Sequence, residues 1–218
     1  MPAEASAARA GRGARLLRIG LPAFALAVML LAIMMMQPRA MSYFGLTLLL
    51  NFALPAVFAT MAQMAITAAG DIDLGIGPFL SLVNCIAATV LATRPLLGWA
   101  ALGLCVLAYG GMGALIHLRR LPSIVVTLGA SFVWLGLALL VLPSPGGAAP
   151  SWLSALLGWQ PPLVPLPVLV SLLLAGFGQF LLVRTSYGVV LRGIGGNPQA
   201  VARAGWSLLN GRIVLYLV

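Results

Sequence analysis

One uncharged stretch decides the fold class of this sequence: Ser123-Ile-Val-Val-Thr-Leu-Gly-Ala-Ser-Phe-Val-Trp-Leu-Gly-Leu-Ala-Leu-Leu-Val-Leu142. An α-helix needs about 20 predominantly apolar residues to cross the hydrocarbon core of a bilayer, and this stretch has that length and character. Five further apolar runs are of similar length. They cover residues 19–37, 44–69, 76–93, 96–118 and 163–183. The sequence therefore predicts an all-α, polytopic transmembrane helical bundle with six full spans and the start of a seventh.

The composition agrees with a lipid-embedded chain. Of 218 residues, 62% are hydrophobic and 7% are charged, against about a quarter charged in soluble domains. The formal net charge is +9, and every basic residue is an arginine. A nucleic-acid reader would carry its basic residues as a stripe on a soluble fold, whereas these arginines lie between apolar runs. We therefore expect contact with membrane lipid and no nucleic-acid partner.

The arginines also predict the orientation of the spans, because cytoplasmic loops carry an excess of basic residues. With the N-terminus in the cytoplasm, Arg39 and Arg94 lie outside. The other ten lie inside: Arg9, Arg12, Arg15, Arg18, Arg119, Arg120, Arg184, Arg192, Arg203 and Arg212. We expect a basic cytoplasmic tail over 1–18 and a transmembrane domain over 19–218. Residues 143–162 form an external loop of that domain, and residues 184–212 form a cytoplasmic loop.

The last residues, 213–218, are apolar but too few to cross a bilayer. A half-span cannot leave its backbone groups unpaired in hydrocarbon. We therefore expect the sequence to be a fragment of a longer protein; the alternative is that its last stretch frays at the inner surface.

Enzyme chemistry is not indicated. One histidine, three acidic residues and scattered serines form no recognisable triad, acid–base pair or metal site. A phosphate-binding P-loop requires a lysine, which the chain lacks. If ATP drives the process, another subunit must bind the ATP and its magnesium.

Two of the three acidic side chains lie in a segment between the second and third runs, which we call the aspartate segment: Ala69-Gly-Asp-Ile-Asp-Leu-Gly-Ile-Gly-Pro78. It is either a tight interfacial turn with solvated aspartates or an irregular segment that lines a cavity, since ionisable groups at membrane depth are costly and usually functional. The candidate residues are Gly70, Asp71, Asp73, Gly75 and Gly77.

A second candidate lies in the loop at 184–212, which we call the coupling segment. Asn197 is a good N-cap, Pro198 suits the first helical position and Gly205 suits the residue after a helix. These signals predict a short surface helix over 198–204 that docks a partner; the alternative is a basic loop on lipid headgroups. The candidate residues are Arg184, Gly188, Arg192, Gly195, Gly196, Asn197, Pro198, Arg203 and Gly205.

Polar residues within the spans mark a candidate translocation path. Thr127, Ser131 and Trp134 share one helix face at spacings of four and three residues. Hydrogen bonds between packed helices explain the same residues without a path. The candidate path residues are Asn51, Gln63, Asn84, Thr127, Ser131 and Trp134.

Three segments resemble the inner-membrane permeases of ABC importers for ribose, xylose and related monosaccharides. The stretch Gly70-Asp-Ile-Asp-Leu-Gly-Ile-Gly77 is similar to that family's Gly-Gly-Ile-Asp-Leu-Ser-Val-Gly signature. The stretch Leu121-Pro-Ser-Ile-Val-Val-Thr-Leu-Gly129 is similar to its Ile-Pro-x-Phe-Ile-Val-Thr-Leu-Gly segment. Arg184-Thr-Ser-Tyr-Gly188 and Gly195-Gly-Asn-Pro198 through Gly205 are similar to its cytoplasmic loop. The matches occur in the family's order over most of residues 61–218.

The resemblance implies a non-enzymatic permease subunit in a bacterial inner membrane that forms the path for a small polar solute, with a monosaccharide favoured. It implies a second permease subunit, cytoplasmic ATPase subunits gripped by the coupling segment, and an external substrate-binding protein. Asp71 and Gly75 depart from the signature, where the family has glycine and serine. A proton-coupled secondary transporter, with Asp71 or Asp73 as proton carrier, and a truncated, non-transporting membrane protein stay open as alternatives.

Overall fold

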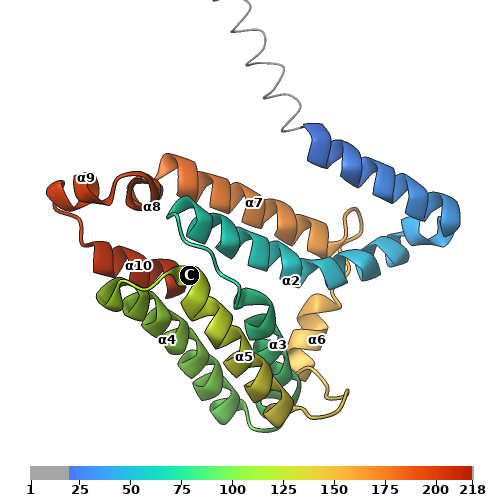
Figure 1. Cartoon of the computed structure of the whole chain (residues 1–218). Helices are drawn as coiled ribbons and strands as arrows, with labels where there is room; N and C mark the ends of the chain where they lie inside the picture. Colours follow the sequence, from blue (N-terminus) through green and yellow to red (C-terminus); the bar gives the residue numbers. More distant parts are fainter. Residues whose placement is uncertain (1–19, 218) are drawn as a thin grey trace, which may run out of the picture. The chain divides into compact units, whose positions relative to one another are not determined.

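The computed structural model describes residues 20–217, and all regular secondary structure within them is helical. The predicted basic tail, residues 1–18, lies outside the described residues. Figure 1 shows the order of the helices along the chain. The chain divides into two compact units at Leu50–Asn51. The aspartate segment and residues 184–212 both lie in the second unit.

The first unit contains the apolar helix Gly20–Met36, the short 3-10 helix η1 (Pro38–Met41) and the start of α2 (Tyr43–Ala68). Ser42 marks the boundary between η1 and α2. Its Oγ donates to the Arg39 carbonyl at 2.7 Å and accepts from the Gly45 backbone N–H at 3.1 Å. The hydroxyl thereby supplies a partner for one of the unpaired amides at the beginning of α2.

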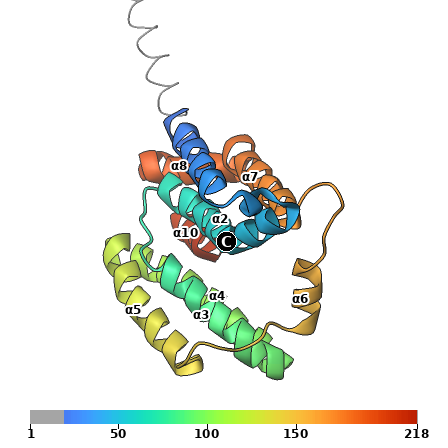
Figure 2. The ribbon, with the colours of Figure 1, turned by 90° about the vertical axis from the view of Figure 1, so that its right-hand side faces the viewer.

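The second unit continues α2 and contains the remaining helices. They are α3 (Ile76–Ile86), its π-helical extension η2 (Ala87–Leu91), α4 (Pro95–Arg119), α5 (Ser123–Val141), α6 (Ser151–Leu157), α7 (Leu166–Arg184), α8 (Ser186–Gly196), α9 (Pro198–Arg203) and α10 (Leu208–Leu217). Figure 2 shows α3, α4 and α5 side by side, and α7 runs along α2 in both ribbon views. Pro55 lies inside α2 without ending it.

The packing of α10 on α4 depends on small residues. A Cβ on Gly110 would lie 2.7 Å from Leu217 Cδ2, and a Cβ on Gly113 would lie 2.9 Å from the Arg212 carbonyl oxygen. Close approach of two backbones across small residues is typical of helices that pack in membranes. α10 is therefore packed closely on α4 at Gly110 and Gly113.

Four helices of the described part are long and apolar enough to cross a membrane, namely α2, α4, α5 and α7. The helices Gly20–Met36 and Ile76–Leu91 are apolar but shorter. α5 buries Thr127, Ser131 and Trp134 and exposes Phe132 and Leu140. A helix with its polar side inward and its apolar side outward suits a lipid surround. The chain is thus an all-helical protein with the helices of a membrane bundle, and the predicted shared face of α5 is confirmed.

Candidate functional site

The aspartate segment leaves α2 through a glycine-dependent turn. Gly70 has φ +78°, its N–H donates to the Thr67 carbonyl at 3.0 Å, and the Asp71 N–H donates to the Ile66 carbonyl at 3.1 Å. This pair of bonds around a left-handed glycine is the Schellman ending of a helix. A non-glycine residue at position 70 would carry the steric penalty of the left-handed region.

Hydroxyl groups at the start of α5 hold the extended part of the segment. The Ile72 N–H donates to Ser123 Oγ at 3.0 Å, and the Leu74 N–H donates to Thr127 Oγ1 at 3.0 Å. Thr127 Oγ1 also donates to the Ile72 carbonyl at 3.3 Å, and the Thr127 side chain is completely buried. Thr127 therefore acts as a backbone clamp in this structure.

Asp73 is buried and bonded on both carboxylate oxygens. Oδ1 accepts from the Gly75 N–H at 2.7 Å, next to the start of α3, and Oδ2 accepts from the Tyr109 hydroxyl at 2.9 Å. Burial raises the pKa of Asp73 above its ordinary value, and the hydrogen bonds from Gly75 and Tyr109 oppose that rise. Asp73 is 3% exposed, so it is not the solvated aspartate of an open turn.

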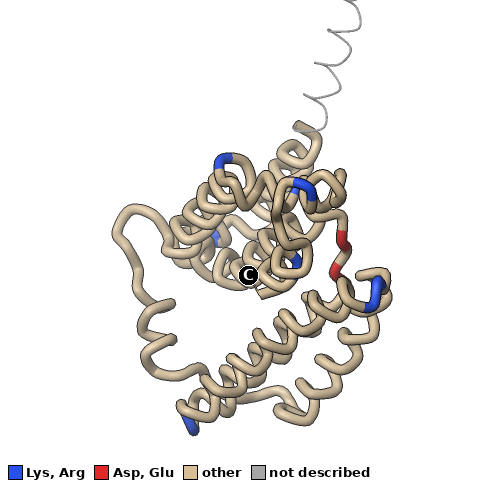
Figure 3. Tube along the Cα trace, turned by 90° about the vertical axis from the view of Figure 1, so that its left-hand side faces the viewer, with Lys and Arg blue, Asp and Glu red and all other residues tan. Residues whose placement is uncertain are grey.

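Asp71 is also buried, but it has a cationic partner. Arg212 Nη2, from α10, lies 3.2 Å from Asp71 Oδ1. Burial raises the pKa of the Asp71 carboxyl, and the positive charge of Arg212 works against this rise. The acidic pair on the connection between α2 and α3 is visible in Figure 3. With both aspartates buried, the reading of the segment as a turn with solvated aspartates is wrong.

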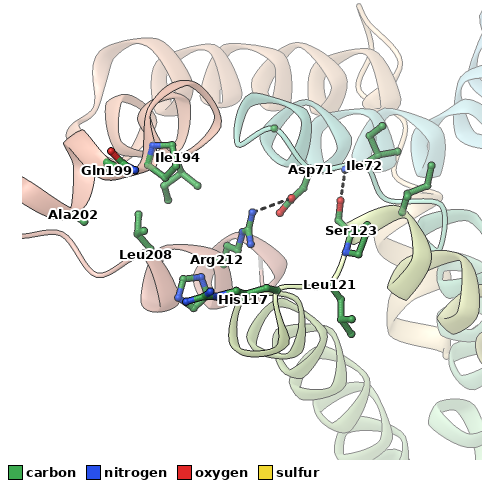
Figure 4. Close-up of a pocket in the computed structure, with 15 residues that line it drawn as sticks. Asp71, Ile72, His117, Leu121, Ser123, Ile194, Gln199, Ala202, Leu208 and Arg212 are labelled. Atoms are coloured by element: carbon green, nitrogen blue, oxygen red, sulfur yellow. Dashed lines mark hydrogen bonds and ion pairs between the residues drawn. The ribbon is translucent and has the colours of Figure 1, made fainter.

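Asp71 and Arg212 line a cavity of about 960 Å³. Figure 4 shows this cavity, with α8 and α9 on one side and the α4–α5 turn on the other. Its polar lining includes His117, Arg120, Ser123 and Gln199, and its apolar walls include Ile72, Leu121, Ile194 and Leu208. We call it the inner cavity. Gly70, Asp71 and Ile72 of the aspartate segment line this cavity, as the alternative reading expects.

The coupling segment contains two capped helices. Asn197 Oδ1 accepts from the Ala200 N–H at 3.0 Å, which caps α9, and Gly205 follows α9 with φ +86°. The predicted short helix is confirmed, with its end at Arg203. The sequence did not predict α8, which begins where Thr185 Oγ1 accepts from the Gly188 N–H at 3.2 Å. Arg212, placed in the loop by the sequence, belongs to α10.

The end of α8 touches the aspartate segment through two glycines. A Cβ on Gly195 would lie 2.6 Å from the Ala68 carbonyl oxygen and 2.9 Å from Gly70 N, closer than real side chains approach backbone. The Gly70 side of the contact is almost as close, because a Cβ there would lie 3.1 Å from Gly195 Cα. Gly195 and Ser123 thus both contact the aspartate segment. Three segments that are far apart in the sequence meet at one place.

The other residues of the coupling segment lie around this contact. Gly188 is buried in α8, and Gly196, Asn197 and Pro198 are exposed at the junction of α8 and α9. Arg184 ends α7 and Arg203 ends α9, and both are exposed. Arg192 lines a separate cavity of about 650 Å³ together with Gln63 and Gln179.

The candidate path residues do not form one continuous group. Asn51 and Asn84 line a cavity of about 530 Å³ between α2 and α3, with Ser81 beside them. Ser131 Oγ donates to the Leu128 carbonyl of its own helix at 2.6 Å. Trp134 packs with Phe79 and Tyr109, at ring-centroid distances of 5.7 and 6.0 Å. Ser131 and Trp134 therefore contribute to helix packing here, while Asn51 and Asn84 face open space. Gly77 lies in the first turn of α3, with open space beside it.

Three residues of the site were not among the sequence candidates: Arg212, Tyr109 and Ser123. Arg212 gave a charge signal that predicted only membrane orientation. Tyr109 gave no signal, because its position opposite Asp73 depends on the packing of α4 against the aspartate segment. Ser123 lies in a segment with a family resemblance, but the resemblance gives no role to its hydroxyl.

No protein-family model matches this chain, and no curated protein or solved structure gives a significant match to it. The site itself is therefore the basis for a functional argument. Among residues 20–217, no group of three or more His, Cys, Asp or Glu side chains is placed to hold a metal ion. The main features of the site are the Asp71–Arg212 ion pair, the inner cavity and the capped helix α9.

Proposed function

We propose that the chain is the permease subunit of a bacterial ATP-driven importer, and that it forms the path for a small polar solute, with a monosaccharide favoured. The observation that carries this proposal is the contact between Gly195 and Gly70. It joins the end of α8, which leads directly into the exposed, capped helix α9, to the segment that lines the inner cavity. A permease driven by an ATPase subunit needs such a mechanical link between the helix that binds the ATPase and the segment that lines the solute path.

In the proposed topology six helices cross the inner membrane and the N-terminus lies in the cytoplasm. The coupling segment then faces the cytoplasm and grips an ATPase subunit, which holds ATP and magnesium. An external binding protein delivers the solute, and a second permease subunit completes the path. The resemblance of all three meeting segments to monosaccharide permeases supports this arrangement.

The proposed mechanism uses α8 and α9 as a lever. Closure of the ATPase subunits would move α9, and α8 would transmit the movement through Gly195 to the backbone of Gly70. The bonds from Ser123 and Thr127 tie the same backbone to α5. Displacement of the aspartate segment would therefore shift several helices together, as alternating access requires.

The proposal can be tested by copurification. The chain is expressed with ATPase subunits of monosaccharide importers, solubilised and purified by its own tag. We expect an ATPase subunit to copurify, and we expect Arg203→Glu, which reverses an exposed charge on α9, to release it. Arg94→Glu is the matched control: Arg94 is also exposed but lies outside in the proposed topology. Retention of the ATPase by both variants, or failure to bind any ATPase, would contradict the proposal.

One observation favours a second candidate, a proton-coupled secondary transporter. Asp73 is buried, and it has no ion-pair partner among the described residues. Such a carboxylate is the type of group that carries protons in membrane transporters. Uptake into cells that stops on addition of an uncoupler while ATP is held constant would favour this candidate over the importer.

A further inference from the structure

The ion pair between Asp71 and Arg212 lies where two cavities approach each other. Both residues line the inner cavity. Asp73, two residues after Asp71, and Tyr216, one helical turn after Arg212, line a second cavity of about 220 Å³. This smaller cavity lies between α2, α3, α4 and α10, with Phe79 and Tyr109 among its aromatic walls. We call it the aromatic cavity. The linings of the two cavities therefore come within two residues of each other at the aspartates and within one helical turn of each other on α10.

Three polar atoms of these residues are buried and unpaired. Asp71 Oδ2, Arg212 Nε and Tyr216 Oη have no hydrogen-bond partner within residues 20–217. A buried polar group without a partner is unfavourable, and a well-packed structural ion pair normally satisfies all of its donors and acceptors. The Coulomb attraction therefore holds the closed arrangement, while the unpaired atoms disfavour it.

Solvent does not reach these three atoms, although the Arg212 side chain as a whole is partly exposed. Separation of Arg212 from Asp71 would expose both side chains. Water or the hydroxyl groups of a solute could then satisfy all three residues, since a hydroxyl both donates and accepts. The pair is therefore better suited to opening and closing than to permanent structural support.

One partner of the ion pair, Asp71, lies next to the coupling segment, and the other, Arg212, is the last residue of that segment. Asp71 follows Gly70, whose backbone is packed on Gly195. Arg212 lies in the second turn of α10, which the short connection 204–207 joins to α9. A displacement of α8 and α9 therefore acts on Asp71 through Gly70 and on Arg212 through the start of α10.

We propose that the Asp71–Arg212 ion pair, with Tyr216 behind it, is the inner gate between the aromatic cavity and the inner cavity. The gate is closed in this structure and opens when the coupling segment moves. The identity of the solute that passes the gate rests on the proposed importer function, whereas the existence of the gate does not. Asp71 stands where the similar permeases have glycine, so the gate would be a particular feature of this chain.

The test measures access to the aromatic cavity through a single thiol. Ala62 lines that cavity and is replaced by cysteine, after Cys85 and Cys105 have been changed to alanine. The full chain is reconstituted in phospholipid nanodiscs and treated with a charged maleimide that does not enter lipid. The labelling rate is compared in the parent, Asp71→Asn, Arg212→Gln and the double variant. Gln199→Cys, in the already open inner cavity, is the matched control thiol.

We expect each single substitution to accelerate labelling at position 62 by about tenfold or more, the scale of a hydrogen bond to a charged group. The double variant should label no faster than the faster single variant, because both substitutions remove the same interaction. Labelling of Gln199→Cys should change by less than about twofold, as expected for a site outside the gate. Unchanged labelling at position 62, or additive effects of the two substitutions, would overturn the gate.

Unfolding must be distinguished from opening. A parallel set of variants keeps the buried Cys105 as its single thiol, and slow labelling there reports a folded bundle. Asp71→Asn preserves the shape of the side chain. Its labelling rate therefore tests the gate even if Arg212→Gln unfolds the chain. Faster labelling at position 62 without copurification of an ATPase would support the gate and remove the importer. Copurification of an ATPase with unchanged labelling at position 62 would support the importer and overturn the gate.

Discussion

The backbone of Gly195 packs directly on the backbone of Gly70, although 125 positions separate them in the chain. Neither partner can move aside like a flexible side chain, because the atoms in contact belong to the main chain. A backbone-to-backbone contact transmits displacement with little loss, since packed interiors resist deformation. The end of α8 and the aspartate segment are therefore linked more rigidly than side-chain contacts would allow.

The first prediction concerns this contact. Gly195→Ala places a methyl group 2.6 Å from the Ala68 carbonyl oxygen. We expect a loss of about 1–3 kcal/mol in stability, the usual cost of overpacking, seen as a lower melting temperature in detergent. Gly196→Ala is the matched control, because nothing lies within 4 Å of its new methyl group. Equal melting temperatures for the two variants would mean that the contact is looser than described.

A second pair of glycines tests the turn at the end of α2. Gly70→Ala forces a side chain into the left-handed region at φ +78° and against Gly195 Cα. We expect it to destabilise the protein by about 1–2 kcal/mol. Gly77→Ala, in the first turn of α3 with open space around it, should be neutral or stabilising by up to about 1 kcal/mol. Thermal unfolding of both variants in the same detergent measures the difference.

The third prediction concerns the hydroxyl of Thr127. Thr127→Val keeps the shape of the side chain but removes the acceptor for the Leu74 N–H, so we expect a loss of about 1–3 kcal/mol. Thr127→Ser keeps the hydroxyl and should cost less. Thr60→Val is the control, because the Thr60 hydroxyl bonds only to the Ala56 carbonyl of its own helix. If Thr60→Val destabilised the protein as much as Thr127→Val does, the role of Thr127 as a backbone clamp would be contradicted.

The sequence predicted those parts of the fold that depend on local signals. Uncharged runs predicted the long helices, and Asn197, Pro198 and Gly205 predicted α9, because capping is decided by neighbours in the chain. The shared face of Thr127, Ser131 and Trp134 follows from helical periodicity alone. These features need no knowledge of how the helices pack.

The remaining features depend on contacts between distant residues. The burial of Asp73 requires Tyr109 from α4, and the burial of Asp71 requires Arg212 from α10. Nothing near the aspartates in the sequence indicates these partners, so solvated and buried aspartates could not be distinguished. α8 was missed because its glycines read as a loop, while its buried face, including Val190, Leu191 and Ile194, depends on tertiary packing.

The fourth prediction is a pH dependence that originates at Asp73. Burial raises the pKa of Asp73 above its ordinary value of 3.8, so the folded protein binds this proton more tightly than the unfolded chain. The resulting stabilisation is complete below the unfolded pKa and is lost as the pH rises through the folded pKa. We therefore expect the melting temperature to fall as the pH increases from about 4.

Asp73→Asn isolates this contribution. An asparagine side chain can still accept from the Gly75 N–H and can donate to the Tyr109 hydroxyl, but it does not titrate. Its melting temperature should decrease less steeply with pH than that of the parent, and the residual slope would belong to Asp71, whose pKa is raised in the same direction. Parallel pH profiles for the variant and the parent would show that Asp73 is ionised throughout. Its bonds to Gly75 and Tyr109 would then be strong enough to outweigh its burial.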